Sequence, residues 1–400
     1  MAVSLLAREV SDLCLGKPAL RSLSISSTVA DALSALKRFA DNYISVWNCD
    51  HRHSSEADKI DAGFDECRCV GKVCMVDIIC FLCKEENLSN PGTALQASVS
   101  ILIPKAPGFV RHLEPNASLV EAIDLILEGA QNLVIPLEIG TMNSRKKLLQ
   151  KSPSNSTLHN NQQYCWLTQE DIIRYLLNSI GLFCPTPINP INSLNIIDAR
   201  NIMAVHYDDP ASLALPFIAQ SLEMQTSVAI VDADGKLIGE ISPFTLNSCD
   251  EDVAAAIATL SAGDLMAYID CGGAPEDLIQ LVKERLQARN LAQALELMEE
   301  DSRISSGASF SSSYSSSSDE EFGVWRSIGR SGGYSARVVR RSEAIVCYPW
   351  SSLVAVMIQA LAHRVSYVWV VQEDGTLAGI VTFAGMMKVF RERFEDYTLG

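Results

Sequence analysis

The chain has 400 residues, of which 48% are hydrophobic, and a formal net charge of −16. This length exceeds one ordinary hydrophobic core and indicates two or more domains. The acidic charge argues against a general nucleic-acid or anionic-membrane surface, because both need basic patches. We see no apolar run that could span a membrane, and residues 1–12 make a poor secretory signal. Twelve cysteines without a regular framework indicate reduced thiols, so we expect a cytoplasmic protein, with the nucleus as the alternative.

One short pattern occurs four times along the chain. A hydroxyl residue and an apolar residue open an apolar-periodic segment, and a short apolar run begins sixteen residues after each hydroxyl. A hydroxyl N-cap, about three helical turns and a buried strand make one supersecondary unit. Such a unit cannot bury its apolar face alone, so four copies are expected to stack. The openings and their runs are Thr28-Val29 with 44–47, Ser118-Leu119 with 134–137, Ser212-Leu213 with 228–231, and Ser352-Leu353 with 368–371.

The third and fourth copies continue with a matching hairpin. Residues 231–239 align with 371–379 position for position, and each stretch has Asp-Gly between apolar runs. Asp-Gly predicts a tight I′ turn, in which both central residues have positive φ. A further helix follows, at 244–248 in the third copy and at 384–394 in the fourth. The predicted unit is therefore helix–strand–turn–strand–helix.

Polar insertions interrupt the first two hairpins. They span 51–66 and 140–163, and the second strands resume at 67–70 and 164–167. Hairpin tips tolerate insertions because they lie on the surface, so we expect solvated loops.

The largest insertion lies between the third and fourth copies. Two segments, 251–260 and 275–300, have helical periodicity, and the serine-rich run 302–318 follows them. Low complexity predicts disorder for this run. Because an arginine-rich tract comes next, phosphorylation could also order it, and Ser318 beside three acidic residues is the candidate.

The order of elements and the matching hairpins resemble the CBS domain, named for cystathionine β-synthase, which usually works in pairs. The resemblance implies an α/β (α+β) fold of four β-α-β-β-α repeats arranged as two CBS-pair sandwiches. The layout is similar to plant proteins built only of CBS repeats and, more distantly, to the γ subunit of AMP-activated kinases. The expected boundaries are 8–85 for repeat 1, 99–183 for repeat 2, 184–195 for the linker, 196–249 for repeat 3, 250–341 for the partly disordered insertion and 342–397 for repeat 4.

The resemblance also implies a ligand site where the second strand enters its last helix. The family pattern there is Gly-x-x-(Ser/Thr)-x-x-Asp. The glycine permits close approach of the backbone, the hydroxyl and the helix N-terminus face a phosphate, and the aspartate accepts from both ribose hydroxyls. In this family the site binds AMP, ADP, ATP or S-adenosylmethionine between paired domains. No other cofactor is expected.

The family pattern is incomplete in every copy. Repeat 1 keeps Gly71 and Asp77 but has Cys74 at the hydroxyl position. Repeat 2 keeps Thr168 and Asp171 without the glycine, and Thr-x-x-Asp is also an ordinary helix cap. Both aspartates belong to the first pair, so we expect nucleotide binding mainly there. The weaker candidates in the second pair are Ser242, Thr382, His363 and Arg364.

The cysteines and histidines offer two other hypotheses. Four potential zinc ligands lie in or beside the first insertion: His51, His53, Cys67 and Cys69. Their spacing matches no finger signature, so no metal site is predicted. Cys80 and Cys83 fit the apolar face of a helix. Cys74 at a helix N-terminus could have a lowered pKa and a redox role.

We found no Gly-Lys-Ser/Thr loop, Gly-x-Ser-x-Gly elbow or His-Glu-x-x-His helix, so no enzyme is predicted. The resemblance implies a non-catalytic regulatory protein that senses an adenosine nucleotide and modulates a protein partner, such as a kinase or a redox enzyme. The alternatives are a phosphorylation-regulated scaffold with vestigial sites and a γ-type kinase subunit. Family members often form homodimers through CBS pairs, although two pairs in one chain could instead close on each other.

Overall fold

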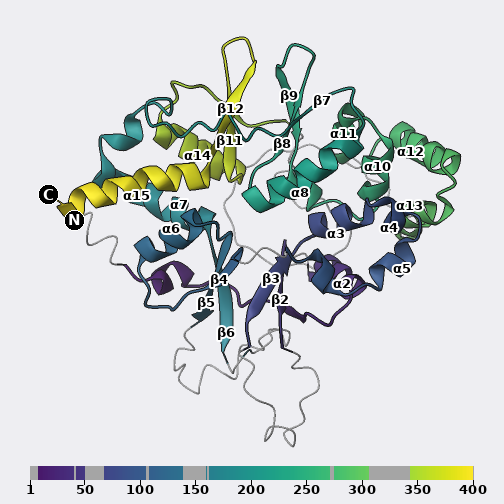
Figure 1. Cartoon of the computed structure of the whole chain (residues 1–400), viewed down its shortest axis with the longest axis horizontal. Helices are drawn as coiled ribbons and strands as arrows, with labels where there is room; N and C mark the ends of the chain where they lie inside the picture. The colour runs from purple at the N-terminus through teal and green to yellow at the C-terminus, as the bar shows by residue number, and fades with distance from the viewer. Residues whose placement is uncertain are drawn as a thin grey trace, which may run out of the picture.

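The computed structural model describes residues 8–39, 42–49, 67–104, 108–137, 159, 162–270, 274–305 and 343–399. This part of the chain contains four three-stranded sheets, each with one parallel and one antiparallel strand pair. Every sheet belongs to one repeat, in which a short strand, a helix, a two-stranded hairpin and a second helix follow each other (Figure 1). The predicted fourfold repeat is confirmed.

The helices and strands have the following bounds. Repeat 1 has β1 (Ser22–Ser24), α2 (Val29–Phe39), β2 (Ile44–Trp47), β3 (Cys69–Val73) and α3 (Met75–Leu82). Repeat 2 has β4 (Val110–His112), α6 (Leu119–Leu127), β5 (Asn132–Leu137), β6 (Gln163–Thr168) and α7 (Gln169–Asn178). Repeat 3 has β7 (Ala204–His206), η5 (Ala211–Ala214), α8 (Leu215–Met224), β8 (Val228–Val231), β9 (Leu237–Ile241) and α9 (Pro243–Leu246). Repeat 4 has β10 (Val346–Cys347), α14 (Leu353–His363), β11 (Tyr367–Val371), β12 (Leu377–Thr382) and α15 (Phe383–Leu399).

The remaining elements connect the repeats. Near the first pair lie η1 (Val10–Cys14), α4 (Glu85–Leu88), α5 (Pro91–Leu95), η2 (Val99–Leu102), η3 (Ile180–Phe183) and η4 (Thr186–Ile188). The large insertion contains α10 (Val253–Thr259), α11 (Ala262–Ile269), α12 (Glu276–Ala288) and α13 (Ala292–Ser305). The sequence predicted helices at 251–260 and 275–300 but missed α11, which is short and includes a glycine. The second predicted segment is two helices, α12 and α13, and α13 continues to Ser305, so the prediction of disorder from residue 302 is wrong for the first four residues of the serine-rich run. Ser318, His51 and His53 lie outside the described residues. None of the described helices is long and apolar enough to cross a membrane.

Three of the four predicted N-caps are confirmed. The hydroxyls of Thr28, Ser118 and Ser352 each accept a hydrogen bond from the backbone N–H three residues later, at 3.1–3.4 Å. The prediction is wrong for Ser212, which lies in the 3-10 turn η5, because α8 begins only at Leu215. Pro216 has no N–H to donate to the carbonyl of Ser212, so an α-helix cannot run continuously from that residue.

The Asp-Gly hairpins are present, but the predicted I′ turn is wrong. In both turns only the glycine has positive φ, 76° at Gly235 and 86° at Gly375. The strand register shifts directly before each turn, so a bulge completes the loop. The two hairpins lie side by side, because the N–H of Leu237 donates to the carbonyl of Gly375 and the N–H of Leu377 donates to that of Gly235, each at 3.1 Å.

Two main cores hold the repeats together. One combines buried residues of repeats 1 and 3, and the other combines those of repeats 2 and 4. Each core forms where helices of the first pair meet helices of the second, for example α3 against α8 and α7 against α14 and α15. Within the first pair, the sheets meet at Trp47, Val134 and Tyr164. Figure 1 shows the first pair in the lower half of the molecule and the second pair above it, so each pair is one sandwich closed against the other.

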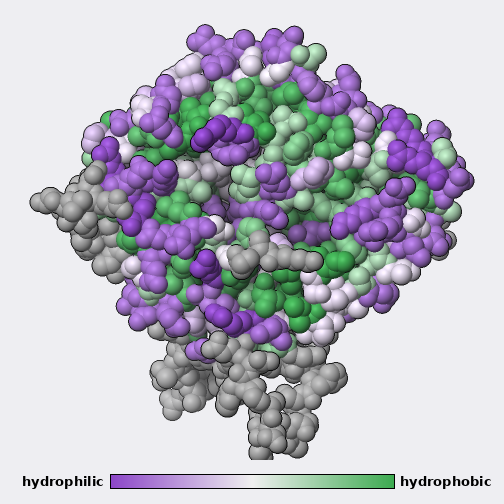
Figure 2. Space-filling model, viewed as in Figure 1, coloured by the Kyte–Doolittle hydropathy of each residue, from purple (hydrophilic) through white to green (hydrophobic). Residues whose placement is uncertain are grey.

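Polar and apolar residues are distributed unevenly over the face seen in Figure 2. Hydrophilic residues gather around the rim, at the tips of the upper hairpins and over α12, and apolar patches lie nearer the middle. The middle of the molecule is where the helices of the two pairs meet, and the cavities described next lie among these elements.

Candidate functional site

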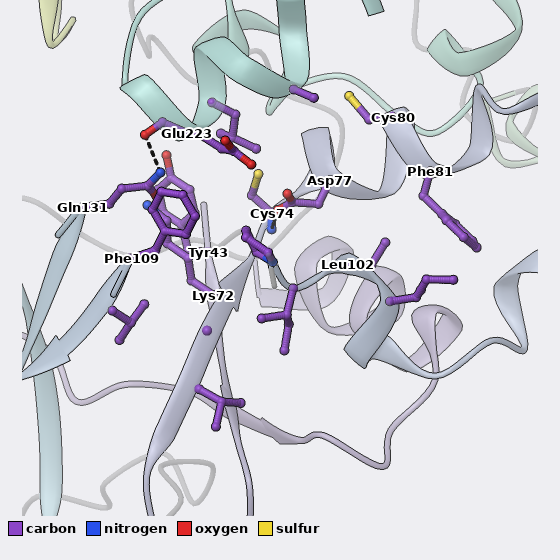
Figure 3. A pocket seen from close by; sticks show the side chains of 18 of the residues that line it. Tyr43, Lys72, Cys74, Asp77, Cys80, Phe81, Leu102, Phe109, Gln131 and Glu223 are labelled. Atoms are coloured by element: carbon purple, nitrogen blue, oxygen red, sulfur yellow. Dashed lines mark hydrogen bonds between the residues drawn. The ribbon is translucent and has the colours of Figure 1, made fainter. Parts of the chain in front are cut away.

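A cavity of 740 Å³ lies where repeats 1 and 2 meet, and α8 of repeat 3 forms one of its walls (Figure 3). Apolar side chains such as Ile103, Phe109 and Leu222 line it, together with a few charged and polar groups. This volume and this mixture are typical of small-molecule sites. Three predicted residues of repeat 1 line the cavity: Gly71, Cys74 and Asp77.

Gly71 is needed for close packing at the cavity wall. A Cβ at this position would lie 2.8 Å from Cγ2 of Ile103, which is closer than ordinary side-chain contacts. Because glycine has no side chain, β3 can approach the segment that leads into repeat 2. The glycine of the predicted motif therefore shapes the wall directly.

Asp77 caps α3 and also faces the cavity. Its Oδ2 accepts the backbone N–H of Cys74 at 2.8 Å, in a reciprocal capping box. Burial raises the pKa of Asp77 to about 6, although the hydrogen bonds from Cys74 and the charge of Lys72 oppose the rise. The carboxyl group is therefore mostly ionised at neutral pH. Figure 3 shows it close to Cys74 and Glu223.

Lys72 supplies positive charge to the same cavity. Its ammonium lies 4.5 Å from the centre of the Tyr43 ring, in a cation–π contact. Burial lowers the pKa of Lys72 to about 8, so the side chain stays mostly protonated at pH 7. Lys72 was not singled out from the sequence, although it lies inside the Gly71–Asp77 motif. Glu223 was missed because it comes from α8 of repeat 3, and only the assembly of the repeats brings it here.

The thiol of Cys74 does not fit the predicted redox role. Its residue is 1% exposed, and burial together with the charge of Asp77 raises its pKa well above the ordinary value. A helix N-terminus favours the thiolate, but desolvation outweighs that effect here. The prediction of a lowered pKa is therefore wrong, and Cys74 acts as the N-cap residue of α3.

The corresponding residues of repeat 2 are arranged differently. Thr168 and Asp171 form the capping box of α7, in which the threonine hydroxyl donates to Asp171 Oδ2 at 2.6 Å. The same carboxylate makes an ion pair with Lys17, which also donates to the carbonyl of Trp166 at 2.7 Å. Asp171 lines neither of the two cavities described here. It connects α7 to the N-terminal segment.

A second cavity of 440 Å³ lies at the centre, with residues of all four repeats around it. Thr168 and Arg364 line it, and Lys72 and Tyr43 line both cavities. Lys37, also in its wall, pairs with Glu251 at 2.6 Å. Of the weaker predicted candidates, only Arg364 faces this space; His363 is exposed at the end of α14.

Ser242 and Thr382 in the second pair line neither cavity. The hydroxyl of Ser242 caps α9 and hydrogen bonds to the Tyr367 hydroxyl at 3.1 Å. The adjacent buried Glu240 accepts from Tyr367 at 2.8 Å and from Trp369 Nε1 at 2.7 Å. Thr382 accepts from a backbone N–H in the first turn of α15. The bonds of Ser242 and Glu240 therefore join repeat 3 to repeat 4, whereas that of Thr382 lies within repeat 4.

Comparison with known proteins agrees with this architecture. No protein-family model matches the chain. It is 48% identical over 405 residues to the CBS domain-containing protein CBSX5 of Arabidopsis thaliana, covering 99% of this chain and 100% of that protein. It is 23% identical to the SNF1-related protein kinase regulatory subunit gamma-like PV42b of the same plant, covering 96% and 94%.

A solved structure has the same fold. It is a Methanocaldococcus jannaschii protein named as a relative of the AMPK γ subunit, with a TM-score of 0.53, 14% identity, and coverage of 96% of this chain and 100% of that one. The four repeats, their pairing and the near-full-length identity to CBSX5 agree, and the chain therefore belongs to the CBS-domain-containing proteins.

Proposed function

We propose that the chain is a non-catalytic regulatory protein that binds an adenosine nucleotide in the 740 Å³ cavity of its first pair. The observation that carries the proposal is the position of Asp77. Its carboxylate faces a mostly apolar cavity at the strand–helix junction where the family pattern carries its ribose ligand. Two vicinal hydroxyls suit one ionised carboxylate, because both can donate to it.

The walls of the cavity suit the other parts of such a ligand. Ile103 and Phe109 offer an apolar surface for an adenine ring. Lys72 can meet a phosphate, and Lys84 adds a second ammonium to the lining. Glu223 would repel phosphate but attract the sulfonium of S-adenosylmethionine, which keeps that molecule as the alternative ligand.

Ligand binding at this site would affect both pairs. The cavity wall includes α8 of repeat 3 as well as elements of repeats 1 and 2. A ligand that contacts all three can favour one arrangement of the pairs, provided that it binds that arrangement more tightly. We propose that this change alters the surface offered to a protein partner. The proposal keeps the cytoplasm as the compartment, with the nucleus as the alternative.

A γ-type regulatory subunit of a kinase is the second candidate function. The full-length similarity to PV42b, named as a γ-like kinase subunit, supports it. The second pair lacks the motif aspartates, so this role would depend on the first pair alone. Copurification of a kinase with the tagged chain tests this function. A recovered amount of kinase that AMP increases or decreases would favour it over a scaffold regulated at Ser318.

Isothermal titration of the purified chain with AMP, ADP, ATP and S-adenosylmethionine tests the proposed site. We expect Asp77→Ala to weaken binding at least tenfold, because charge-assisted hydrogen bonds contribute about 1.5–3 kcal/mol each. Asp171→Ala is the matched control, since it removes the same motif position outside the cavity. Equal loss in both variants, or no binding of any of the four ligands by folded protein, would contradict the proposal.

A further inference from the structure

Three side chains of types that can bind metal ions converge at the edge of the first pair, away from the 740 Å³ cavity. The sulfurs of Cys49 and Cys67 lie 2.7 Å apart. Nδ1 of His159 lies 3.3 Å from the first sulfur and 3.2 Å from the second. All three atoms fall within 4.8 Å of one another, and none of these residues lines the cavity.

The three side chains come from both repeats of the pair. Cys49 follows β2 and Cys67 precedes β3, so both lie at the far end of the repeat 1 hairpin. His159 precedes β6 in repeat 2, where its backbone exchanges two hydrogen bonds of 3.0 Å with Gln162. The cluster therefore joins the ends of two hairpins at the points where the sequence carries its first two insertions.

The surroundings fix the orientation of the imidazole. Its ring stacks on Trp47 with centroids 3.6 Å apart and planes 7° apart. Nε2 lies 2.9 Å from the hydroxyl of Ser22. A proton on Nε2, donated to that hydroxyl, leaves the lone pair of Nδ1 directed at the two sulfurs. Metal-bound histidines commonly have such a partner on the second ring nitrogen.

We propose that Cys49, Cys67 and His159 bind a zinc-type divalent cation. Two sulfurs and one imidazole nitrogen are a ligand set that Zn²⁺ prefers. Tetrahedral coordination with Zn–S bonds of about 2.3 Å requires the two sulfurs to move apart from 2.7 Å to about 4 Å, and a water molecule completes the coordination. Binding takes the two thiols as thiolates and releases their protons to solvent. The bound cation links the hairpins of repeats 1 and 2 and stabilises the sheet interface of the first pair.

The zinc ligands that we considered from the sequence, around the first insertion, were a different set of residues. Cys69 was placed with Cys67, but its sulfur donates to the carbonyl of Gly71 at 3.3 Å and does not belong to the group of three converging ligand atoms. His159 was not considered, because it lies 110 residues from Cys49. Cys69→Ser is therefore a control that removes a neighbouring buried thiol without removing a proposed ligand.

Titration of the full chain with Co²⁺ in a non-thiol reductant tests this site. We expect one Co²⁺ per chain, a thiolate-to-cobalt charge-transfer band, and displacement of Co²⁺ by Zn²⁺. Cys67→Ser and His159→Gln should lose the band or shift it, whereas Cys69→Ser should keep it. Circular dichroism checks that each variant folds, and His159→Gln still tests the site if Cys67→Ser does not fold.

Three results would overturn the metal proposal. One is the absence of a thiolate–cobalt band in the folded wild-type chain. Another is an unchanged band in both ligand variants. The third is a Cys49–Cys67 disulfide that persists in reductant, detected by peptide mapping. A rise in melting temperature with Zn²⁺ that Cys69→Ser retains and His159→Gln lacks would support the proposal independently of the spectrum.

Discussion

Asp77→Asn should stabilise the ligand-free protein, and the gain should grow with pH. Burial raises the pKa of this carboxyl from an ordinary 3.8 to about 6, so folding favours its protonated form. Well below pH 3.8 the carboxyl is protonated in both the folded and the unfolded chain and contributes no difference. Between pH 4 and 6 the penalty for the buried charge develops, and above pH 6 it is complete.

The size of the effect follows from the pKa rise. A rise of about two corresponds to about 3 kcal/mol of unfolding free energy. The gain in the variant will be smaller, between about 1 and 3 kcal/mol, because Asp77 is partly exposed and because Lys72 loses a nearby negative charge. The asparagine oxygen can still accept the N–H of Cys74, so the cap of α3 should survive.

Thermal denaturation of both proteins from pH 5 to pH 8 measures the difference. We expect the melting temperature of Asp77→Asn to exceed that of wild type by a few degrees at pH 8 and by about half as much at pH 5, where about half of the penalty has developed. Asp171→Asn is the control of opposite sign, because it breaks the ion pair with Lys17 and should lower the melting temperature. A variant that is less stable than wild type at pH 8, or a difference that does not change with pH, would refute the reasoning.

Three further predictions concern single side chains. Lys72→Met should weaken AMP but not adenosine, and wild-type AMP affinity should fall above pH 8, where the ammonium deprotonates; titration calorimetry with both ligands measures this. Glu240→Ala leaves two buried donors without their acceptor and should cost about 2–6 kcal/mol in urea unfolding, whereas the exposed Glu373→Ala should change stability by less than about 0.5. Gly379→Ala places a Cβ 2.5 Å from Ile197 at the start of repeat 3 and should cost about 1–3 kcal/mol, whereas Gly181→Ala meets nothing within 4 Å and should be near neutral by the same assay.

The features that could be predicted from the sequence are local ones. The spacing from Ser118 to the strand of repeat 2 identified both the cap and the strand, because helix length and burial pattern are encoded within one repeat. The motif from Gly71 to Asp77 identified one wall of the cavity for the same reason. The error at Ser212 also has a local cause. Pro216 prevents an α-helix from running on from Ser212, and the prediction followed the repeat pattern instead.

The features that the sequence could not predict depend on which repeats face each other. Glu223 reaches the cavity because repeat 3 packs on repeat 1, and no spacing along the chain encodes that choice. His159 meets Cys49 only when the two hairpins of the first pair lie side by side. The sequence also could not predict that Asp77 and Asp171 have different roles, because the role of Asp171 depends on its ion pair with Lys17, far away in the sequence.

The two pairs differ in what occupies the strand–helix junction, and this difference explains why we place the ligand in the first pair. In repeat 4, Gly379 lies against Ile197, and the N–H and carbonyl of Asp198 pair with those of Ile380. In repeat 3, the junction residue Ser242 is fully buried against Tyr367. In repeat 1, Gly71 and Asp77 instead border 740 Å³ of space. The protein's own side chains and the start of repeat 3 therefore fill the junctions of the second pair, whereas at the proposed site the first pair has both the carboxylate and open space beside it.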